Sequence, residues 1–529
     1  MKLSGRKTFL LTVVGIVLVA ALGVTLYFWR AKLAVLNYRK QLIAAGEKLS
    51  VKELIPPPPA KEDDGAELFY RANALIPSNG KNLISTNPPH AMRLVAPGKA
   101  MIGWQQTELR DDKVTNSWND LAGTLAQMTA EIQLLDQLAN KKTIDFRFNY
   151  NQGFSGLLPM LMPTKRATQL LGAATIFALY EGDEESATAH IRAMLGLTRG
   201  LTDERIIISQ LVRIVLAVIT QETTWSFLQS TNVTDTQLAM IQKDWAALDF
   251  IVPSQHALEM ERAVSEMTIG DMRESSAEFH KVIDSYGGSS GAFTFGSGNL
   301  VERGLHIGKE VMEKTAEASK EATWRVAWSY PDQLRMLKGS QVQIETARMA
   351  HSNGCFSAAL ALQRSRLGKL GFIGNLDEDA FAILFNDGHD LQNIFSSGVS
   401  AVEGMLHKVM AIEIRKQLVI TAIALKRYQL QHGKFPANLK ALCPEFLPTI
   451  PIDPVNDEPL HYKPNPDGTF LLYSVGDDGE DNGGDANPAE GKSKSNTWQR
   501  GRDWVWPQPA SEQEIEDYYR QQSLKKSRE

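Results

Sequence analysis

The chain has 529 residues, which is too long for one ordinary domain and sufficient for two or three with a sizeable apolar core. Its 56 basic and 61 acidic residues give a formal net charge of −5, with both signs interspersed, which disfavours nucleic acid as a partner. The two cysteines, Cys355 and Cys443, lack the spacing of a zinc or redox motif, and the sequence leaves open whether they pair.

The N-terminus predicts a membrane helix. Residues 1–8 are basic, and residues 9–29 read FLLTVVGIVLVAALGVTLYFW without a charge. At a rise of about 1.5 Å per residue, this run is long enough to cross the hydrocarbon core of a bilayer. A cleavable signal peptide is the alternative, but its apolar run is usually shorter. We expect an uncleaved anchor with Tyr27, Phe28 and Trp29 at the membrane interface, and basic residues on both sides leave its orientation open.

The next segments predict helices. Residues 30–59 indicate a helix that leaves the membrane and stops at a stiff spacer of four prolines. Residues 60–404 have mainly helical periodicity and predict a helical bundle or an irregular solenoid, without a repeat of constant length. Within them, Gly182 and Asp183 are expected to end one helix and cap the next. A glycine- and serine-rich stretch at 286–300 predicts a mobile loop.

The pattern changes at residues 405–506. A long amphipathic helix closed by Gly433 is followed by short apolar segments punctuated by prolines. The segments LHYK and TFLLYSV, separated by PNPDG, predict two antiparallel strands and a turn. We expect a separate unit there, followed at 507–529 by a charged tail whose last residues form a frayed helix or remain a tail. The predicted fold class is α+β, with a transmembrane helix, a large mainly α-helical centre and a C-terminal helix plus small antiparallel β-sheet.

An acidic stretch follows the second of these strands. Residues 473–485, YSVGDDGEDNGGD, hold four aspartates and one glutamate. Adjacent carboxylates repel one another unless they lie in a solvated loop or share a cation. Calcium takes about six to eight oxygen ligands, and Gly479, Gly483 and Gly484 would let a loop wrap around it. A solvated turn that binds nothing specific is the alternative.

Several motifs in residues 405–506 occur in a recognisable order. They are ALKRYQLQHGKFPANLKAL, LPTIPIDPVNDEPLHYKPNPDG, FLLYSVGDDG and RDWVW. This order resembles the globular head of the major pseudopilin of bacterial type II secretion systems, the G class of the type IV pilin-like superfamily. The resemblance implies a calcium ion in the acidic loop, with Asp478 and Asp503 at ligand positions. Arg502 replaces a second late acid of that family, so Asp481 or Asp485 would have to supply its ligand.

The membrane segment departs from that family. A pseudopilin carries a glutamate inside its membrane helix, and this glutamate directs assembly into a filament. Residues 9–29 contain no glutamate, and residues 30–404 separate them from the pseudopilin-like segment. We therefore expect a head appended to a membrane-anchored helical protein, and no polymerisation.

No metal-protease, phosphate-loop or nucleophile-elbow motif occurs in the sequence, and we expect no enzyme. His351 and Cys355 are four residues apart and would share a helix face if both were helical, but a buried cysteine near a capping or exposed histidine is the favoured interpretation. Two further polar groups are expected on a solvated helix face and in a loop, respectively: His256, Glu259 and Arg262, and Asp387, His389 and Asp390.

These expectations combine into one functional hypothesis. The chain is expected to be a single-pass protein of a bacterial inner membrane, with its N-terminal helix in the lipid bilayer and its bulk on the periplasmic side. It would serve as a scaffold or partner-binding component with a calcium-stabilised head and an unidentified protein partner. The first alternative is an accessory subunit of a type II secretion or pilus-like machine. The second is an envelope enzyme with a site in the helical region.

Overall fold

The computed structural model describes most of the chain. The described residues are 5–75, 83–86, 88–110, 115–155, 159–286, 318, 320–372, 394–402, 404–488 and 502–526. The loop expected at 286–300, apart from its first residue, and the polar group at Asp387, His389 and Asp390 lie outside them.

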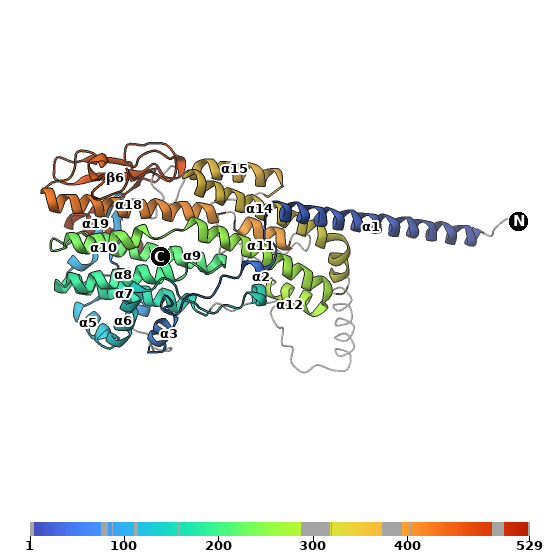
Figure 1. Ribbon diagram of the computed structural model, residues 1–529, viewed down its shortest axis with the longest axis horizontal. Helices are drawn as coiled ribbons and strands as arrows, with labels where there is room; N and C mark the ends of the chain where they lie inside the picture. Colours follow the sequence, from blue (N-terminus) through green and yellow to red (C-terminus); the bar gives the residue numbers. More distant parts are fainter. Residues whose placement is uncertain are drawn as a thin grey trace.

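Helix α1, Gly5–Ala44, extends from the body as a single rod (Figure 1). Its apolar first part is exposed, as at Val19 with 72% of its surface accessible, whereas Val35 and Leu42 in its second part are buried. The helix ends where Gly46 adopts a φ of 86°. A second, short helix α2, Val51–Leu54, follows before the prolines. The single helix predicted up to the proline spacer is therefore divided into the end of α1 and α2.

Two helices are long and apolar enough to cross a membrane. They are the part of α1 from Thr12 to Ala44 and helix α9, Ile207–Phe227. The apolar stretch of α1 has no buried residue, whereas 56% of the apolar stretch of α9 is buried inside the body. α9 is therefore explained as a core helix, and α1 provides the candidate anchor.

The body consists of packed helices. They are α3 Ala66–Leu75, α4 Leu83–Thr86, α5 Trp118–Ala126, α6 Thr129–Asp136, α7 Leu161–Glu181, α8 Glu184–Gly200, α10 Asp235–Ala246, α11 Ile251–Glu274, α12 Ser276–Tyr286, α14 Ser329–Asn353, α15 Phe356–Lys369 and α17 Ile394–Ala401. A π-helical turn, η4 Trp324–Trp328, precedes α14. The predicted caps between α7 and α8 are confirmed: Gly182 has a φ of 76°, and the Asp183 carboxylate accepts a hydrogen bond from Ser186 N–H.

Short strands interrupt the predicted helical region. β1 Met92–Ala96 and β2 Lys99–Ile102 form an antiparallel hairpin, and β3 Leu109–Arg110 pairs with β4 Thr115–Asn116. β8 Gln508–Pro509 pairs in parallel with β2.

The chain's last described helix, α19 Glu512–Lys526, packs on this hairpin. Ile515 lies against Val95 and Met101, and the Tyr519 hydroxyl donates to the Arg110 carbonyl at 3.2 Å. The expected helix is present in these residues, but it is docked rather than frayed, because a few apolar side chains hold an otherwise charged helix on the hairpin.

The C-terminal elements follow the predicted order. α18 Met405–His432 ends at Gly433, whose φ is 69°. β5 His461–Pro464 pairs antiparallel with β6 Phe470–Ser474, and β6 pairs with β7 Trp504–Val505. The helix, its cap and the two predicted strands are confirmed as secondary structure.

α18 joins this sheet to the body. It packs against α9 and α10 as well as against β6. One continuous apolar core contains Trp225 of α9, Trp245 of α10, Ile412 of α18 and Leu472 of β6. The expected division at residue 405 therefore runs through a shared core, because α18 is buried on the side of the body as well as beneath the sheet.

Candidate functional site

The acidic loop begins after β6 and is closed by β7. A short 3₁₀ turn, Gly476–Asp478, starts it, with Gly476 at a φ of 69°. A side chain at Gly476 would meet the Trp504 ring at 2.7 Å, so glycine is required for this close approach. Of the four predicted ligand residues, Asp478, Asp481 and Asp485 thus lie in this loop, and Asp503 directly precedes its closing strand.

Asp503 is the fully buried member of this set. Its carboxylate accepts hydrogen bonds from the backbone N–H groups of Gly484 at 2.7 Å, Asp485 at 3.1 Å and Asn482 at 3.3 Å. Burial raises the pKa of Asp503, while these three donors favour its ionised form. Asp503 therefore holds the loop backbone together from inside.

The other three aspartates stabilise local turns. Each accepts a hydrogen bond from the N–H group two residues later: Glu480 for Asp478 at 3.0 Å, Gly483 for Asp481 at 2.9 Å and Asn487 for Asp485 at 3.0 Å. The Tyr473 hydroxyl also donates to Asp481 at 2.8 Å. These bonds lower the pKa of Asp481 and of Asp485.

Basic side chains surround the same loop. His461 Nδ1 lies 3.4 Å from Asp481, Arg502 Nη1 lies 3.7 Å from Asp485, and His407 Nε2 lies 3.3 Å from Asp477. Within the described residues, no group of three or more His, Cys, Asp or Glu side chains is arranged to hold a metal ion. The crowded carboxylates are thus accommodated largely by backbone donors and neighbouring bases.

Asp453 is a positioning residue that the sequence reasoning missed. It is fully buried, and it accepts hydrogen bonds from Val455 N–H at 3.0 Å, the Ser474 hydroxyl at 2.9 Å and Val475 N–H at 2.9 Å. These bonds join the proline-rich turn to the end of β6, where the acidic loop begins. An aspartate enclosed by two prolines was the signal available in the sequence.

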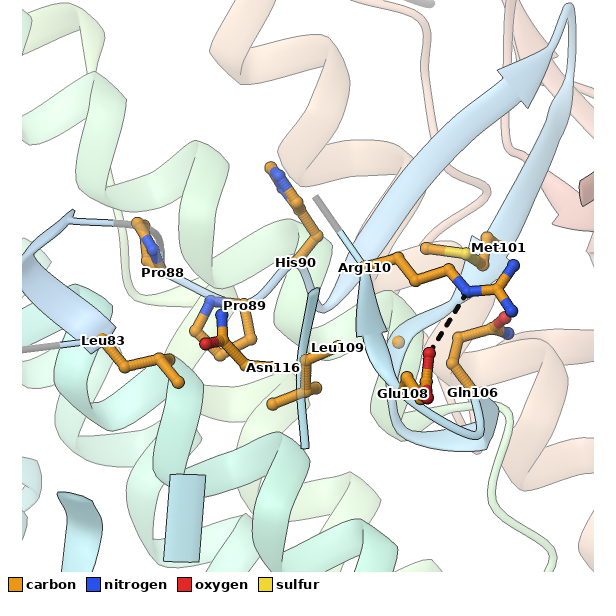
Figure 2. Close-up of a pocket in the computed structure, with 11 residues that line it drawn as sticks. Leu83, Pro88, Pro89, His90, Met101, Gln106, Glu108, Leu109, Arg110 and Asn116 are labelled. Atoms are coloured by element: carbon orange, nitrogen blue, oxygen red, sulfur yellow. Dashed lines mark ion pairs between the residues drawn. The ribbon is translucent and has the colours of Figure 1, made fainter. Parts of the chain in front are cut away.

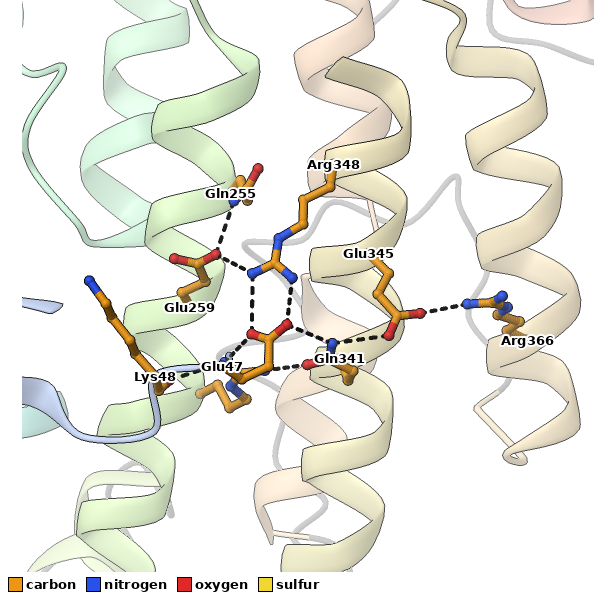
Figure 3. A network of polar contacts seen from close by, with 9 residues as sticks. Glu47, Lys48, Gln255, Glu259, Gln341, Glu345, Arg348 and Arg366 are labelled. Carbon is orange, nitrogen blue, oxygen red and sulfur yellow. Dashed lines mark hydrogen bonds and ion pairs between the residues drawn. The ribbon is translucent and has the colours of Figure 1, made fainter. Parts of the chain in front are cut away.

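A second polar cluster lies at the base of α1 (Figure 3). Glu47, just after that helix, accepts hydrogen bonds from Arg262 at 2.9 Å, Gln341 at 3.0 Å and Arg348 at 3.1 Å. Burial opposes its charge, but these donors prevail and lower the pKa of Glu47 to about 2. The cluster ties the N-terminal segment to α11 and α14.

The predicted solvated face at Glu259 and Arg262 was wrong. These residues are 9% and 1% exposed, respectively, and Arg348 Nη2 lies 2.7 Å from Glu259. The periodicity of one helix does not show which of its polar faces packs against another helix. The ion pairs of Glu259 and Arg262 were therefore not predictable from residue spacing. His351 is exposed, as the favoured interpretation has it, but Cys355 is only partly buried; α14 ends at Asn353, so the two residues do not share a helix face.

A small hollow lies beside β3 and β4 (Figure 2). Pro89, Met101 and Leu109 supply part of its lining, and Arg110 forms an ion pair with Glu108 at 3.8 Å beside them. Its volume of about 20 Å³ admits a water molecule but no organic ligand.

Comparison with known proteins identifies no family: no family profile, curated protein or solved structure matches the chain. Function is therefore inferred from the residues and their geometry.

Proposed function

We propose that the chain is a membrane-anchored scaffold of the bacterial envelope, with α1 in the bilayer and the helical body held rigidly at its surface. The supporting observation is the continuity of α1. One uninterrupted helix of 40 residues has an exposed apolar first part and a second part that is packed into the body. The membrane segment then sets the orientation of the body through a continuous helix rather than through a flexible linker.

The joint between anchor and body is densely bonded. α1 contacts α14 and η4, and Val35 and Leu42 share an apolar cluster with Met336 and Leu337. The Glu47 cluster fixes the chain just beyond the helix. Removing one member of a buried ion pair is costly, so this joint resists swivelling.

Aromatic and basic side chains gather where α1 leaves the body. Phe28 packs edge-on against Tyr330 with ring centroids 5.2 Å apart, Arg273 lies over the Tyr330 ring at 3.7 Å, and Lys32 lies over Trp29 at 5.3 Å. Tryptophan and tyrosine are enriched at the boundary between lipid and water. They support a bilayer surface at the level of η4 and the first turn of α14.

Membrane washing tests the anchor. The full chain should stay with membranes through high salt and carbonate, whereas a chain starting at Lys32 should be released, since hydrophobic anchoring is insensitive to charge screening. The cut at Lys32 retains the buried part of α1, which a chain starting at Asp64 would lose. Release of the full chain by carbonate would contradict the proposal.

We also propose that the acidic loop binds calcium through Asp478, Asp481 and Asp485. The support for this proposal is chemical: three carboxylates and glycine-rich backbone lie within one short loop, and calcium prefers flexible oxygen ligands. Because the described side chains are not arranged around a metal ion, the loop would have to rearrange on binding. Asp503 is turned toward backbone donors and would support the loop from within. The bound ion would supply positive charge that offsets carboxylate repulsion.

A further inference from the structure

A cavity of about 220 Å³ lies among residues 146–152, the start of α7 and the turn before α9. Apolar side chains form much of its wall, namely Phe146, Phe148, Met160, Leu161 and Leu201. The volume is several times the roughly 30 Å³ that one water molecule occupies in the liquid. The cavity is therefore large enough for a small organic ligand.

One carboxyl group lines this cavity with few partners. Glu204 is 8% exposed, and the Tyr150 hydroxyl donates to its Oε2 over a long 3.4 Å. Tyr150 is oriented by Arg205, whose N–H donates to the hydroxyl oxygen at 3.2 Å. Within the described part of the chain, no side-chain or backbone donor is bonded to the second carboxylate oxygen of Glu204, Oε1.

Burial and two neighbouring carboxylates make the ionised form of Glu204 unfavourable. Burial, together with the carboxylates of Asp145 and Asp203, raises the pKa of Glu204 to about 7 against the lowering effect of the Tyr150 hydroxyl. Two arginines lie on the same segments. Arg147 also lines the cavity, and its charge opposes the rise that burial causes in the pKa of Tyr70, whereas Arg205 opposes the same rise in the pKa of Tyr150. A positive charge beside Glu204 would relieve this imbalance.

We propose that this cavity binds a small organic cation, with the Glu204 carboxylate as its counter-charge and Phe146 and Phe148 against its apolar part. An apolar wall with one convergent carboxyl is the arrangement that selects an ammonium group on an apolar body. When Glu204 starts protonated, binding expels its proton to solvent and leaves a carboxylate–ammonium pair. The site is separate from the membrane anchor and does not depend on the proposed scaffold function.

The test uses the full chain in detergent with benzylammonium as the probe and benzyl alcohol as its neutral counterpart. Isothermal titration in two buffers of different ionisation enthalpy measures affinity and proton release together. We expect benzylammonium to bind at least tenfold more tightly than benzyl alcohol at pH 8. Below pH 7 its affinity should fall about tenfold per pH unit, with release approaching one proton, whereas benzyl alcohol should show no such dependence.

Variants separate charge from shape. Glu204→Gln should reduce benzylammonium affinity at least tenfold at pH 8, whereas Glu185→Gln, at an exposed position of α8, should leave it unchanged. Equal binding of the two probes by the wild-type chain, or full benzylammonium affinity in a folded Glu204→Gln chain, would overturn the proposal. If Glu204→Gln does not fold, the wild-type comparison of the two probes across pH decides.

Discussion

Buried carboxyl groups in this protein differ in pKa because their hydrogen-bond partners differ. Glu47 and Glu204 are both 8% exposed, yet their pKa values are about 2 and about 7. Three charged or amide side chains donate to Glu47, whereas Glu204 has one long bond from a tyrosine. Desolvation acts on both groups, so partners decide whether burial leaves a fixed charge or a titratable group.

Glu47 should make stability depend on acid pH. Its folded-state pKa of about 2 is below the ordinary 4.5, so its contribution is fully present above pH 4.5 and is lost as the pH falls toward 2. The shift corresponds to about 3 kcal/mol. The difference in stability between wild-type and Glu47→Gln chains, measured by thermal unfolding, should therefore be full at pH 7, roughly half as large at pH 3 and smaller still toward pH 2. A difference that stays constant across this range would contradict the assignment, and Glu185→Gln is the control.

Calcium binding at the acidic loop should stabilise the folded chain. At a hundredfold excess over Kd, binding would contribute about 2.7 kcal/mol, and magnesium less because it requires tighter octahedral geometry. Calcium should raise the melting temperature of the wild-type chain, and Asp478→Asn should remove most of that rise. Glu458→Gln, at an exposed position outside the loop, should preserve it. Equal melting in chelator and calcium would leave the loop as a turn stabilised by its own donors.

At the scale of elements, local signals were predictable and distant pairings were not. The ends of α7 and α18 follow from Gly182 and Gly433, whose left-handed backbone terminates a helix whatever surrounds it. The strands β1 and β2 are short, and β8 joins them from the other end of the chain. In the acidic loop the sequence identified the aspartates, but the inward orientation of Asp503 depends on contacts made after folding.

The docking of α19 should be measurable. Ile515 is 8% exposed against the β1–β2 hairpin, whereas Leu524 of the same helix is 54% exposed. Ile515→Ala should destabilise the chain by about 2 kcal/mol, and Leu524→Ala should have little effect. Hydrogen exchange in residues 512–526 should rise in the first variant only. Equal effects of both substitutions would indicate that the helix is not docked through Ile515.

At the scale of the whole molecule, one core unites the body and the C-terminal sheet. Fully buried α18 residues such as Ile412 and Leu418 share that core with Trp225 of α9. This arrangement was not predictable from the change in composition at residue 405, because a change in local pattern does not reveal which faces are shared.

A fragment of residues 404–508 should therefore fail to fold alone. It would expose the α18 face that α9 and α10 cover, and we expect a noncooperative melt and rapid proteolysis. The chain starting at Lys32 is the control and should melt cooperatively. A cooperative melt of the short fragment would show that the sheet and α18 suffice without the body.

The depth of the body relative to the bilayer tests the scaffold proposal most directly. In a chain with Cys355→Ala and Cys443→Ala, single cysteines replace Leu22 in the anchor, Val326 in η4 or Lys463 in β5, all exposed positions. Figure 1 shows the sheet of β6, to which β5 belongs, at the end of the body away from the exposed part of α1. Each fluorescently labelled chain is placed in nanodiscs with brominated lipids. We expect strong quenching at Leu22, partial quenching at Val326 and none at Lys463; quenching at Leu22 with equal signals at Val326 and Lys463 would contradict a rigidly held body.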